Sequence, residues 1–341
     1  MNVIIIGGGP GGLSAAIWCS RLGLKVTVLE SENLPRIKPG EALHPGIRTI
    51  FKELGVEEEI EASAVVRHSA MWVKWSSDLE LVSFGSDQDG PWFGYQLLRT
   101  ELNTILQQKA QRLGANVKQS CRVIGLAFDS GKICGVRTSQ GYIEADYVID
   151  AAGPSHWIAR RLGLKIERYS PLMIVYYGYA KGNCPAREKA PALVATSNGW
   201  IWTARVHKEL YQWTRLDFKK TPISRDWLPS EFKGLRTTHD GIHGADVTWR
   251  RVIGTAGAKY FTVGDAAVVL DPASSHGILR AIMSGIMAGH AINKILSDSD
   301  GEKIVAYEYE KWLSQWFFYD LANLRKLYLQ HPNCPRSFHS V

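Results

Sequence analysis

The sequence contains little cysteine and no long apolar run. Its five cysteines are odd in number and widely scattered, and none is paired as C-x-x-C, so neither a disulfide framework nor a zinc site is indicated. No apolar stretch approaches the roughly 20 residues that a membrane-spanning helix needs. A glycine-rich segment begins too soon after Met1 to leave room for a signal peptide. We therefore expect a cytoplasmic protein with reduced thiols, no metal and no membrane span.

The sequence also lacks a concentrated block of charge, a repeat and a low-complexity segment. Its 40 Lys and Arg residues exceed its 33 Asp and Glu residues, but they are spread along the chain rather than gathered into an arm or stripe. This pattern argues against a nucleic-acid partner and favours a merely solvated basic surface, with attraction of an anionic cofactor or an acidic partner as the alternative. With 341 residues, of which 45% are hydrophobic, the chain can form two domains, or one domain with a large insertion.

Glycine, in contrast, is concentrated near the N-terminus. The segment VIIIGGGPGG reads as a buried parallel strand followed by a tight turn, and LSAAIWCSRLGL after it reads as a helix. Gly7, Gly9 and Gly12 fit the spacing G-x-G-x-x-G, in which the glycines permit the turn, the approach of a pyrophosphate and close packing of helix and strand. The helix N-terminus attracts the phosphates.

A second predicted strand, KVTVLE, completes this unit. It ends in Glu30, 18 residues after Gly12, where a carboxylate accepts hydrogen bonds from the ribose hydroxyls of adenosine. Strand, helix, strand and acid together predict a dinucleotide-binding site. FAD and NAD are both compatible with this fingerprint.

The segment from Tyr260 to Ile292 distinguishes between them. It reads as a strand, the pair Gly264-Asp265, a turn with Pro272 and Gly277, and a long helix of small residues that starts near Ser275. It resembles the GD motif and following helix of the glutathione-reductase-like flavoproteins, in particular the group of aromatic hydroxylases, tryptophan halogenases and geranylgeranyl reductases. The resemblance implies FAD, with Asp265 on its ribityl chain and the turn and helix N-terminus at the flavin.

Three segments in the middle of the chain extend the resemblance. LPRIKPGEALHPGI is similar to the family's loop with a GE pair, here ending in Glu41, and GYQLLRTELNTIL is similar to a strand-to-helix step whose arginine, here Arg99, contacts FAD. ADYVIDAAGPSHWIARRLGL matches the family's returning strand, turn and short helix. The resemblance implies an α/β fold, namely a Rossmann-type FAD-binding domain with an inserted antiparallel β-sheet substrate domain and C-terminal helices.

The position of these segments predicts the domain organisation. We expect a discontinuous FAD-binding domain at 1–70, 95–165 and 255–300, a substrate-binding sheet at 71–94 and 166–254, and a segment of one or two amphipathic helices at 301–341. The inserted segments alternate apolar with polar residues, as antiparallel strands do, and are rich in Trp and Tyr. The segments that show this pattern are SAMWVKWSSDLELVSFG, LMIVYYGYAKG, NGWIWTARV and LYQWTRLDF. We expect them to form a pocket for a flat aromatic substrate, lined by Trp72, Tyr95, Trp200 and Trp202.

Three sequence features bear on the reaction. Halogenases of the resembling type carry a lysine where this chain has Met71, and the nearest lysine, Lys74, is offset by three positions. The W-x-W part of their W-x-W-x-I-P motif is kept at Trp200 and Trp202, but Ile-Pro is lost. The Asp-Gly pair that serves NADPH in single-component hydroxylases is replaced by Ala152-Gly153, so either NAD(P)H or a separate flavin reductase remains open as electron donor.

Two histidines are candidate catalytic bases. His44 and His276 lie in loops that the resemblance places beside the flavin ring, and an imidazole that titrates near neutrality can remove the proton from a hydroxylated ring. We therefore expect an FAD-dependent monooxygenase that hydroxylates an aromatic substrate, such as an indole, a tryptophan or a protein-borne tryptophan during quinone cofactor maturation. A flavin-dependent halogenase, a geranylgeranyl-type reductase and a non-catalytic FAD-binding chaperone are the alternatives.

Overall fold

The computed structural model describes residues 1–33, 42–64, 66–88, 90–219, 221–297 and 301–338. Glu41, a predicted cofactor ligand, lies outside the described residues, as does most of the predicted GE loop.

A six-stranded sheet forms the part of the molecule predicted to bind the dinucleotide. Its order is β10 (Asn116–Lys118), β2 (Lys25–Leu29), β1 (Asn2–Ile6), β14 (Tyr147–Asp150), β24 (Tyr260–Thr262) and β23 (Ala256–Gly257). The first five strands are parallel, and β23 is an antiparallel edge. Because both faces of β1 are covered, Val3 to Ile6 are all buried and read as a continuous apolar run.

Different layers cover the two faces of this sheet. Val3 and Ile5 share a core with the helices α1 (Pro10–Arg21), α4 (Arg99–Arg112) and α6 (Gly277–Ser297). Ile4 and Ile6 on the opposite face pack into a second core with the antiparallel strands β11 (Val123–Asp129), β12 (Lys132–Thr138) and β13 (Gly141–Glu144), and with α5 (Trp157–Arg161). The alternation of side chains along β1 thus fixes which layer each residue contacts.

The inserted segments form a second sheet of eight strands. Its order is β20 (Arg236–Thr237), β16 (Ile174–Lys181), β19 (Leu210–Asp217), β18 (Gly199–His207), β17 (Ala192–Thr196), β5 (Ala70–Lys74) and β6 (Glu80–Ser83), with β21 (His243–Asp246) also paired to β16. The described pairs are antiparallel except β17 with β5, which is parallel. The sequence predicted β5, β6, β16, β18 and β19, but not β17, β20 or β21.

The register separates an inner from an outer face of the eight-stranded sheet. Trp202 lies opposite Thr214, which in turn lies opposite Tyr177, so these side chains share one face. That inner face packs against the main core. The outer face carries Tyr211 and Trp213, which form a separate small core with Phe232.

Short strands and helices connect the two large sheets. They are β3 (Ala42–Leu43), β4 (Val66–His68) and β9 (Gly94–Gln96) in one sheet, β15 (Ile166–Arg168), β22 (Arg250–Val252) and β25 (Val268–Val269) in another, the hairpin β7 (Ser86–Asp87) and β8 (Gly90–Pro91), and the helices α2 (Ile47–Leu54) and α3 (Glu57–Ser63).

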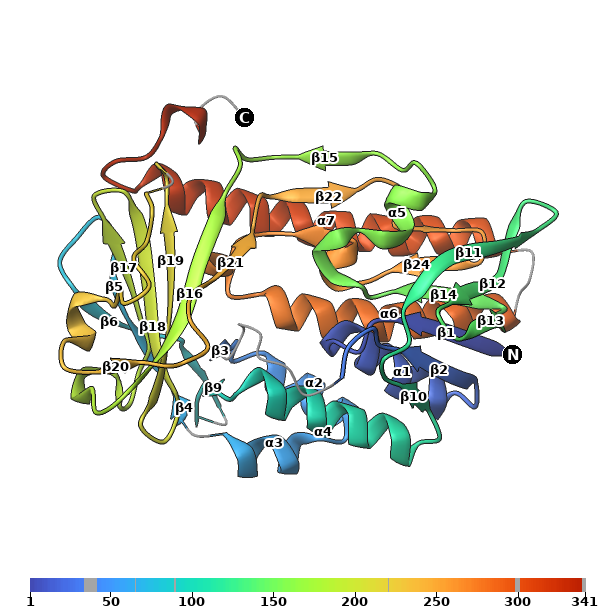
Figure 1. Cartoon of the computed structure of the whole chain (residues 1–341), viewed down its shortest axis with the longest axis horizontal. Coiled ribbons are helices and arrows are strands. Elements are labelled where there is room, and N and C mark those ends of the chain that lie inside the picture. The colour runs from blue at the N-terminus through green and yellow to red at the C-terminus, as the bar shows by residue number, and fades with distance from the viewer. Residues whose placement is uncertain (34–41, 65, 89, 220, 298–300, 339–341) are drawn as a thin grey trace.

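The C-terminal segment is one long helix, α7 (Glu302–Leu329), where the sequence left one or two open. It runs from the parallel sheet to the eight-stranded sheet (Figure 1). The Tyr309 hydroxyl donates to the Thr262 carbonyl of β24 (2.8 Å), and Tyr328 at the other end lies in the core beneath β18. The described helices include none with the length and apolarity that crossing a bilayer requires.

We predict that Gly285→Ala destabilises the protein. A Cβ at this position would lie 2.2 Å from the Gly11 carbonyl oxygen, so α6 would have to move away from α1. Overpacking of this kind costs about 1–3 kcal/mol, and thermal unfolding would measure it as a lowered Tm. Gly289→Ala is the graded control, because its Cβ would meet the adjustable Trp18 side chain at 3.0 Å. Equal Tm values for the two variants and the parent would contradict the expected tight contact.

Candidate flavin and substrate site

The glycine turn between β1 and α1 has the shape that the fingerprint requires. Gly7 has φ +105°, and a Cβ there would lie 2.5 Å from the Ala151 carbonyl oxygen. A Cβ on Gly12 would lie 2.0 Å from the Gly7 carbonyl oxygen, so only glycine allows the helix to pack so closely. Gly9 instead has open space within 4 Å of its would-be Cβ, at the helix N-terminus. This opening is where a pyrophosphate can approach the backbone.

Glu30 lies beside this turn at the end of β2. Its side chain is 4% exposed, and Oε2 accepts a hydrogen bond from the Gly8 amide (2.9 Å). Oε1 accepts from the Glu32 amide (3.1 Å), so the carboxylate is fixed in position. A ribose that reached this carboxylate would find preorganised acceptors, which fits the predicted contact with adenosine.

The pair Gly264-Asp265 follows β24 in a short 3-10 turn. Gly264 has φ +57° and its amide donates to Ser284 Oγ of α6 (2.9 Å). Asp265 is exposed. Its charge favours the protonated forms of Arg250 and Arg280, although burial is the larger effect and lowers the pKa of both guanidinium groups. Asp265 therefore presents a carboxylate outward from the turn, as binding of a hydroxylated chain requires.

Arg99 and Gln96 flank the step from β9 to α4. Arg99 begins the helix, and its Nε donates to Asn103 Oδ1 (3.2 Å). Gln96 is 1% exposed, yet neither its Oε1 nor its Nε2 has a hydrogen-bond partner among the described residues. Buried amides are normally paired. The unpaired amide, the open space at Gly9 and the outward Asp265 together fit a bound FAD.

The turn from Asp271 to Gly277 is held from several sides. Asp271 is fully buried, and burial raises its pKa to about 6 against the opposing effect of hydrogen bonds from Trp249 Nε1 (2.7 Å), Tyr328 and the Ala273 amide. Pro272 opens a 3-10 turn, and Gly277 begins α6. Ser275 between them has φ +57°, a strained conformation for a residue with a Cβ.

The two candidate bases lie next to each other. The centroids of the His44 and His276 rings are 4.8 Å apart in an edge-on arrangement. His276 Nδ1 lies 2.8 Å from Asp320 Oδ1 of α7, and Asp320 Oδ2 accepts from Arg280 Nη1 (3.0 Å). Burial, followed by the nearby His276, lowers the pKa of His44 to about 4.

The predicted aromatic residues do not all come together. Trp202 lies on the inner face of the sheet and is partly buried against the main core. Trp200 is fully buried and its indole N–H donates to Tyr328 Oη (2.8 Å), so it is enclosed by α7. Trp72 alternates with Met71 and Val73 and thus points to the outer face. Tyr95 is buried, and its hydroxyl donates to Glu61 (3.2 Å) rather than to another member of the set.

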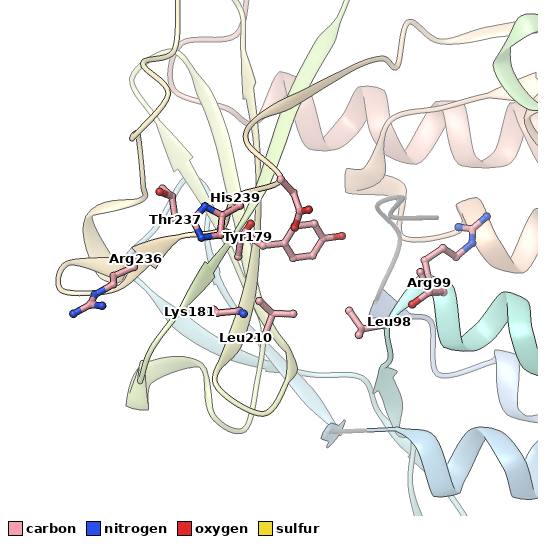
Figure 2. A pocket seen from close by; sticks show the side chains of 11 residues that line it. Leu98, Arg99, Tyr179, Lys181, Leu210, Arg236, Thr237 and His239 are labelled. Carbon is pink, nitrogen blue, oxygen red and sulfur yellow. The ribbon is translucent and has the colours of Figure 1, made fainter. Parts of the chain in front are cut away.

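A cavity of about 600 Å³ lies between the N-terminus of α4 and the strands β16, β19 and β20. Figure 2 shows Tyr179 and Leu98 reaching toward each other across it, while the Arg99 guanidinium turns away from the strands. Its size is typical of a site for a small molecule. Strand alternation in YYGYAKG predicted a strand here, but not that Tyr179 and Lys181 would line a cavity with α4.

Sequence reasoning also missed Asp320, Arg280 and Gln96. Asp320 and Arg280 are separated by 40 residues, and nothing local in the C-terminal segment marks an acid for this role. A charged residue in the apolar run GILRAIMSG was the one available signal for Arg280.

Comparisons with known proteins agree with this arrangement. The model of the FAD binding domain family matches residues 1–316, so the chain belongs to that family. It is 25% identical to the tryptophan 2-halogenase of Chondromyces crocatus over 87% of this chain and 62% of that protein, so it spans less than two thirds of that relative. It is 25% identical to the 1H-pyrrole-2-carbonyl-[peptidyl-carrier protein] chlorinase of Pseudomonas fluorescens (Pf-5) over 97% of this chain and 86% of that one.

Solved structures show the same fold. The flavin-dependent halogenase CmlS superposes with a TM-score of 0.86 at 23% identity, covering 99% of this chain and 66% of that one. The Pseudomonas aeruginosa protein pqsL, described as a probable FAD-dependent monooxygenase, superposes with a TM-score of 0.81 at 16% identity, covering 94% of each chain. The chain thus belongs to a family of FAD-binding proteins whose similar members include flavin-dependent halogenases, and it has the α/β fold with a C-terminal helical segment that the sequence predicted.

We predict that Asp265→Ala yields protein largely lacking FAD. Loss of a charge-assisted hydrogen bond costs about 1.5–3 kcal/mol, which weakens binding by about tenfold to a hundredfold. Flavin absorbance after gel filtration and titration of FAD into the stripped protein would measure this change. Asp129→Ala, at the end of an exposed hairpin strand, is the matched control. Full flavin occupancy in Asp265→Ala would mean that this carboxylate does not contact the cofactor.

Proposed function

We propose that this protein is an FAD-dependent monooxygenase that hydroxylates an aromatic substrate. The observation that carries the proposal is the residue at the inner face of β5. Met71 occupies that face and packs against the main core, whereas Lys74, offset by three positions, belongs to the opposite set and is exposed at the end of the strand. The lysine that the resemblance expects of a halogenase is therefore missing from the inner face of β5.

The proposed substrate site combines the inner face of the eight-stranded sheet with the cavity at α4. Trp202, Tyr177 and Tyr179 on β18 and β16 offer aromatic surfaces, with Leu98 opposite Tyr179. These groups suit a flat ring such as an indole. The tryptophan 2-halogenase among the relatives is named for such a substrate. We include free tryptophan and a protein-borne tryptophan in the proposal, with NAD(P)H or a flavin reductase as electron donor.

The proposed chemistry divides between cofactor and chain. Bound FAD, when reduced, would supply the electrons that activate O₂, one atom of which enters the substrate. The chain would orient the ring and exclude water with the buried inner face. His276 would accept the proton that the substrate ring loses when the new C–O bond forms, and His44 would remain neutral beside it.

We predict that turnover adds about 16 mass units to the aromatic product, one oxygen atom. The label should come from ¹⁸O₂ gas, and added chloride or bromide should not change the product. Mass spectrometry after incubation with enzyme, reductant, O₂ and indole, tryptophan or a tryptophan peptide would test this. A brominated product in bromide would assign the protein to the halogenases instead. A substrate reduced at a carbon–carbon double bond would assign it to the reductases, and bound FAD without any product would favour the chaperone alternative.

We predict that His276→Ala lowers kcat by about a hundredfold or more while FAD remains bound, because a general base contributes at least that much. Burial lowers the pKa of His44 to about 4, so His44 stays neutral and should add no inflection to the pH–rate profile between about pH 5 and pH 8. Normal turnover of both His276→Ala and His44→Ala would show that neither imidazole is the base, even if hydroxylation is observed.

A further inference from the structure

Asp320, a buried acid of the C-terminal helix α7, contacts both the loop before α6 and the first turn of α6. Asp320 of α7 has a side chain that is 1% exposed, and its two oxygens bind different partners. Oδ1 lies 2.8 Å from His276 Nδ1, in the loop before α6, and Oδ2 accepts from Arg280 Nη1 in the first turn of that helix. The carboxylate thus bridges the loop and the helix that resemble the flavin-facing part of the family.

The hydrogen-bond partners of His276 and His44 determine which nitrogen of each imidazole ring carries the proton. An ionised carboxylate is only an acceptor, so His276 must donate its Nδ1–H to Asp320, which leaves Nε2 as the acceptor of a neutral ring. The Gly46 amide donates to His44 Nδ1 (3.0 Å), so a neutral His44 carries its proton on Nε2. The two neighbouring rings therefore have opposite tautomers, one offering an acceptor and the other a donor.

Arg280 pairs with the second oxygen of the Asp320 carboxylate. A lone buried carboxylate is costly, but Arg280, itself 1% exposed, provides a cation at 3.0 Å. Burial lowers the pKa of Arg280, and the charges of Asp265, in the turn after β24, and of Asp320 oppose this effect. Among the described residues, the titratable or charged groups around His276 are Asp320 from α7, His44 from the loop after β3 and Arg280 from α6. The centroid of the Trp316 ring of α7 lies 6.5 Å from that of His276.

We propose that Asp320 is the positioning residue of the site: it fixes His276 in the Nδ1–H tautomer and makes Nε2 the proton acceptor, while Arg280 binds the other carboxylate oxygen. The role of His276 in turnover rests on the proposed function, whereas the tautomer does not. When the substrate ring loses its proton, the proton moves to Nε2, and Asp320 stabilises the resulting imidazolium. No change in oxidation state of the chain is involved.

A purely structural role for Asp320 makes a different prediction. In that case the carboxylate would only join α7 to α6, and its loss would lower stability or FAD content without altering the tautomer of His276. The α7 helix has other anchors that serve this purpose, among them Tyr309 on Thr262 and Tyr328 beneath Trp200. Separating the two roles therefore requires a readout of the imidazole itself.

The first experiment is ¹⁵N NMR of the FAD-loaded enzyme labelled at histidine, with the His276 resonances assigned by their loss in His276→Gln. At neutral pH we expect the Nδ1–H tautomer for His276 in the unmodified protein. An Nε2–H tautomer there would overturn the proposal, whatever reaction the enzyme catalyses. This measurement needs no substrate, so it succeeds or fails independently of hydroxylation.

The second experiment uses Asp320→Asn, because an amide can donate to Nδ1 and so move the ring proton to Nε2. We expect kcat to fall by about tenfold or more, with KM and FAD occupancy little changed, and a His276 spectrum shifted toward Nε2–H. Asp320→Glu should restore part of the rate.

Two further variants complete the test. Asp320→Asn/Arg280→Met removes both buried charges and provides a folded protein if the single variant leaves Arg280 too costly to bury. Glu308→Gln removes an exposed acid of α7, paired with Lys294, and should leave rate and spectrum unchanged. An unaltered His276 spectrum in a folded Asp320 variant, or loss of FAD with an unaltered tautomer, would overturn the positioning role.

Discussion

The hydrogen bonds that converge on Asp271 connect three layers of this protein at one point. The buried carboxylate accepts from the indole of Trp249, next to β22, from the hydroxyl of Tyr328 on α7, and from the amide of Ala273 in its own turn. Tyr328 in turn accepts from Trp200 of the eight-stranded sheet. Removing the acid would leave two buried aromatic donors without a partner, and each such group costs about 1–3 kcal/mol. The conformation of the turn that leads into α6 therefore depends on contacts from distant parts of the chain.

The helices α6 and α1 pack closely against each other through their backbones. Gly285 of α6 allows contact with Gly11 of α1, and Ser14 Oγ donates to the Ile282 carbonyl (3.0 Å). The helix that begins at the Asp271–Gly277 turn and the helix that begins at the glycine turn are thus fixed against each other. Since the resemblance predicts that the fingerprint and the GD pair contact different parts of one extended cofactor, their relative position is as important as their separate shapes.

The sequence was sufficient where function depends on local geometry. The spacing of Gly7, Gly9 and Gly12 is a property of one turn, and the structure gives each the backbone conformation or open space that its role needs. The sequence did not show on which face of the sheet a strand residue lies, or which residues from distant parts of the chain contact it. The spacing of Trp200 and Trp202 puts both side chains on one face of their strand. Only the position of α7 decides that Trp200 is enclosed. Trp72 was assigned to the pocket, but its register with β17 turns it to the outer face. The loop with Glu41 lies outside the described residues, so its predicted contact stays a prediction.

The sequence of the C-terminal helix α7 predicts a structural element and gives no direct sign of a functional residue. Its pattern of buried residues, including Tyr309, Leu313 and Phe317, is that of any amphipathic helix packed on a core. Asp320 falls within the same buried stripe, where an acid is unfavourable unless cations or donors meet it. His276 and Arg280 provide those partners from a segment 40 or more residues earlier. A buried acid on an otherwise apolar helix face is thus a signal that the surrounding fold must supply a charged partner. In this protein that partner belongs to the segment at the predicted flavin site.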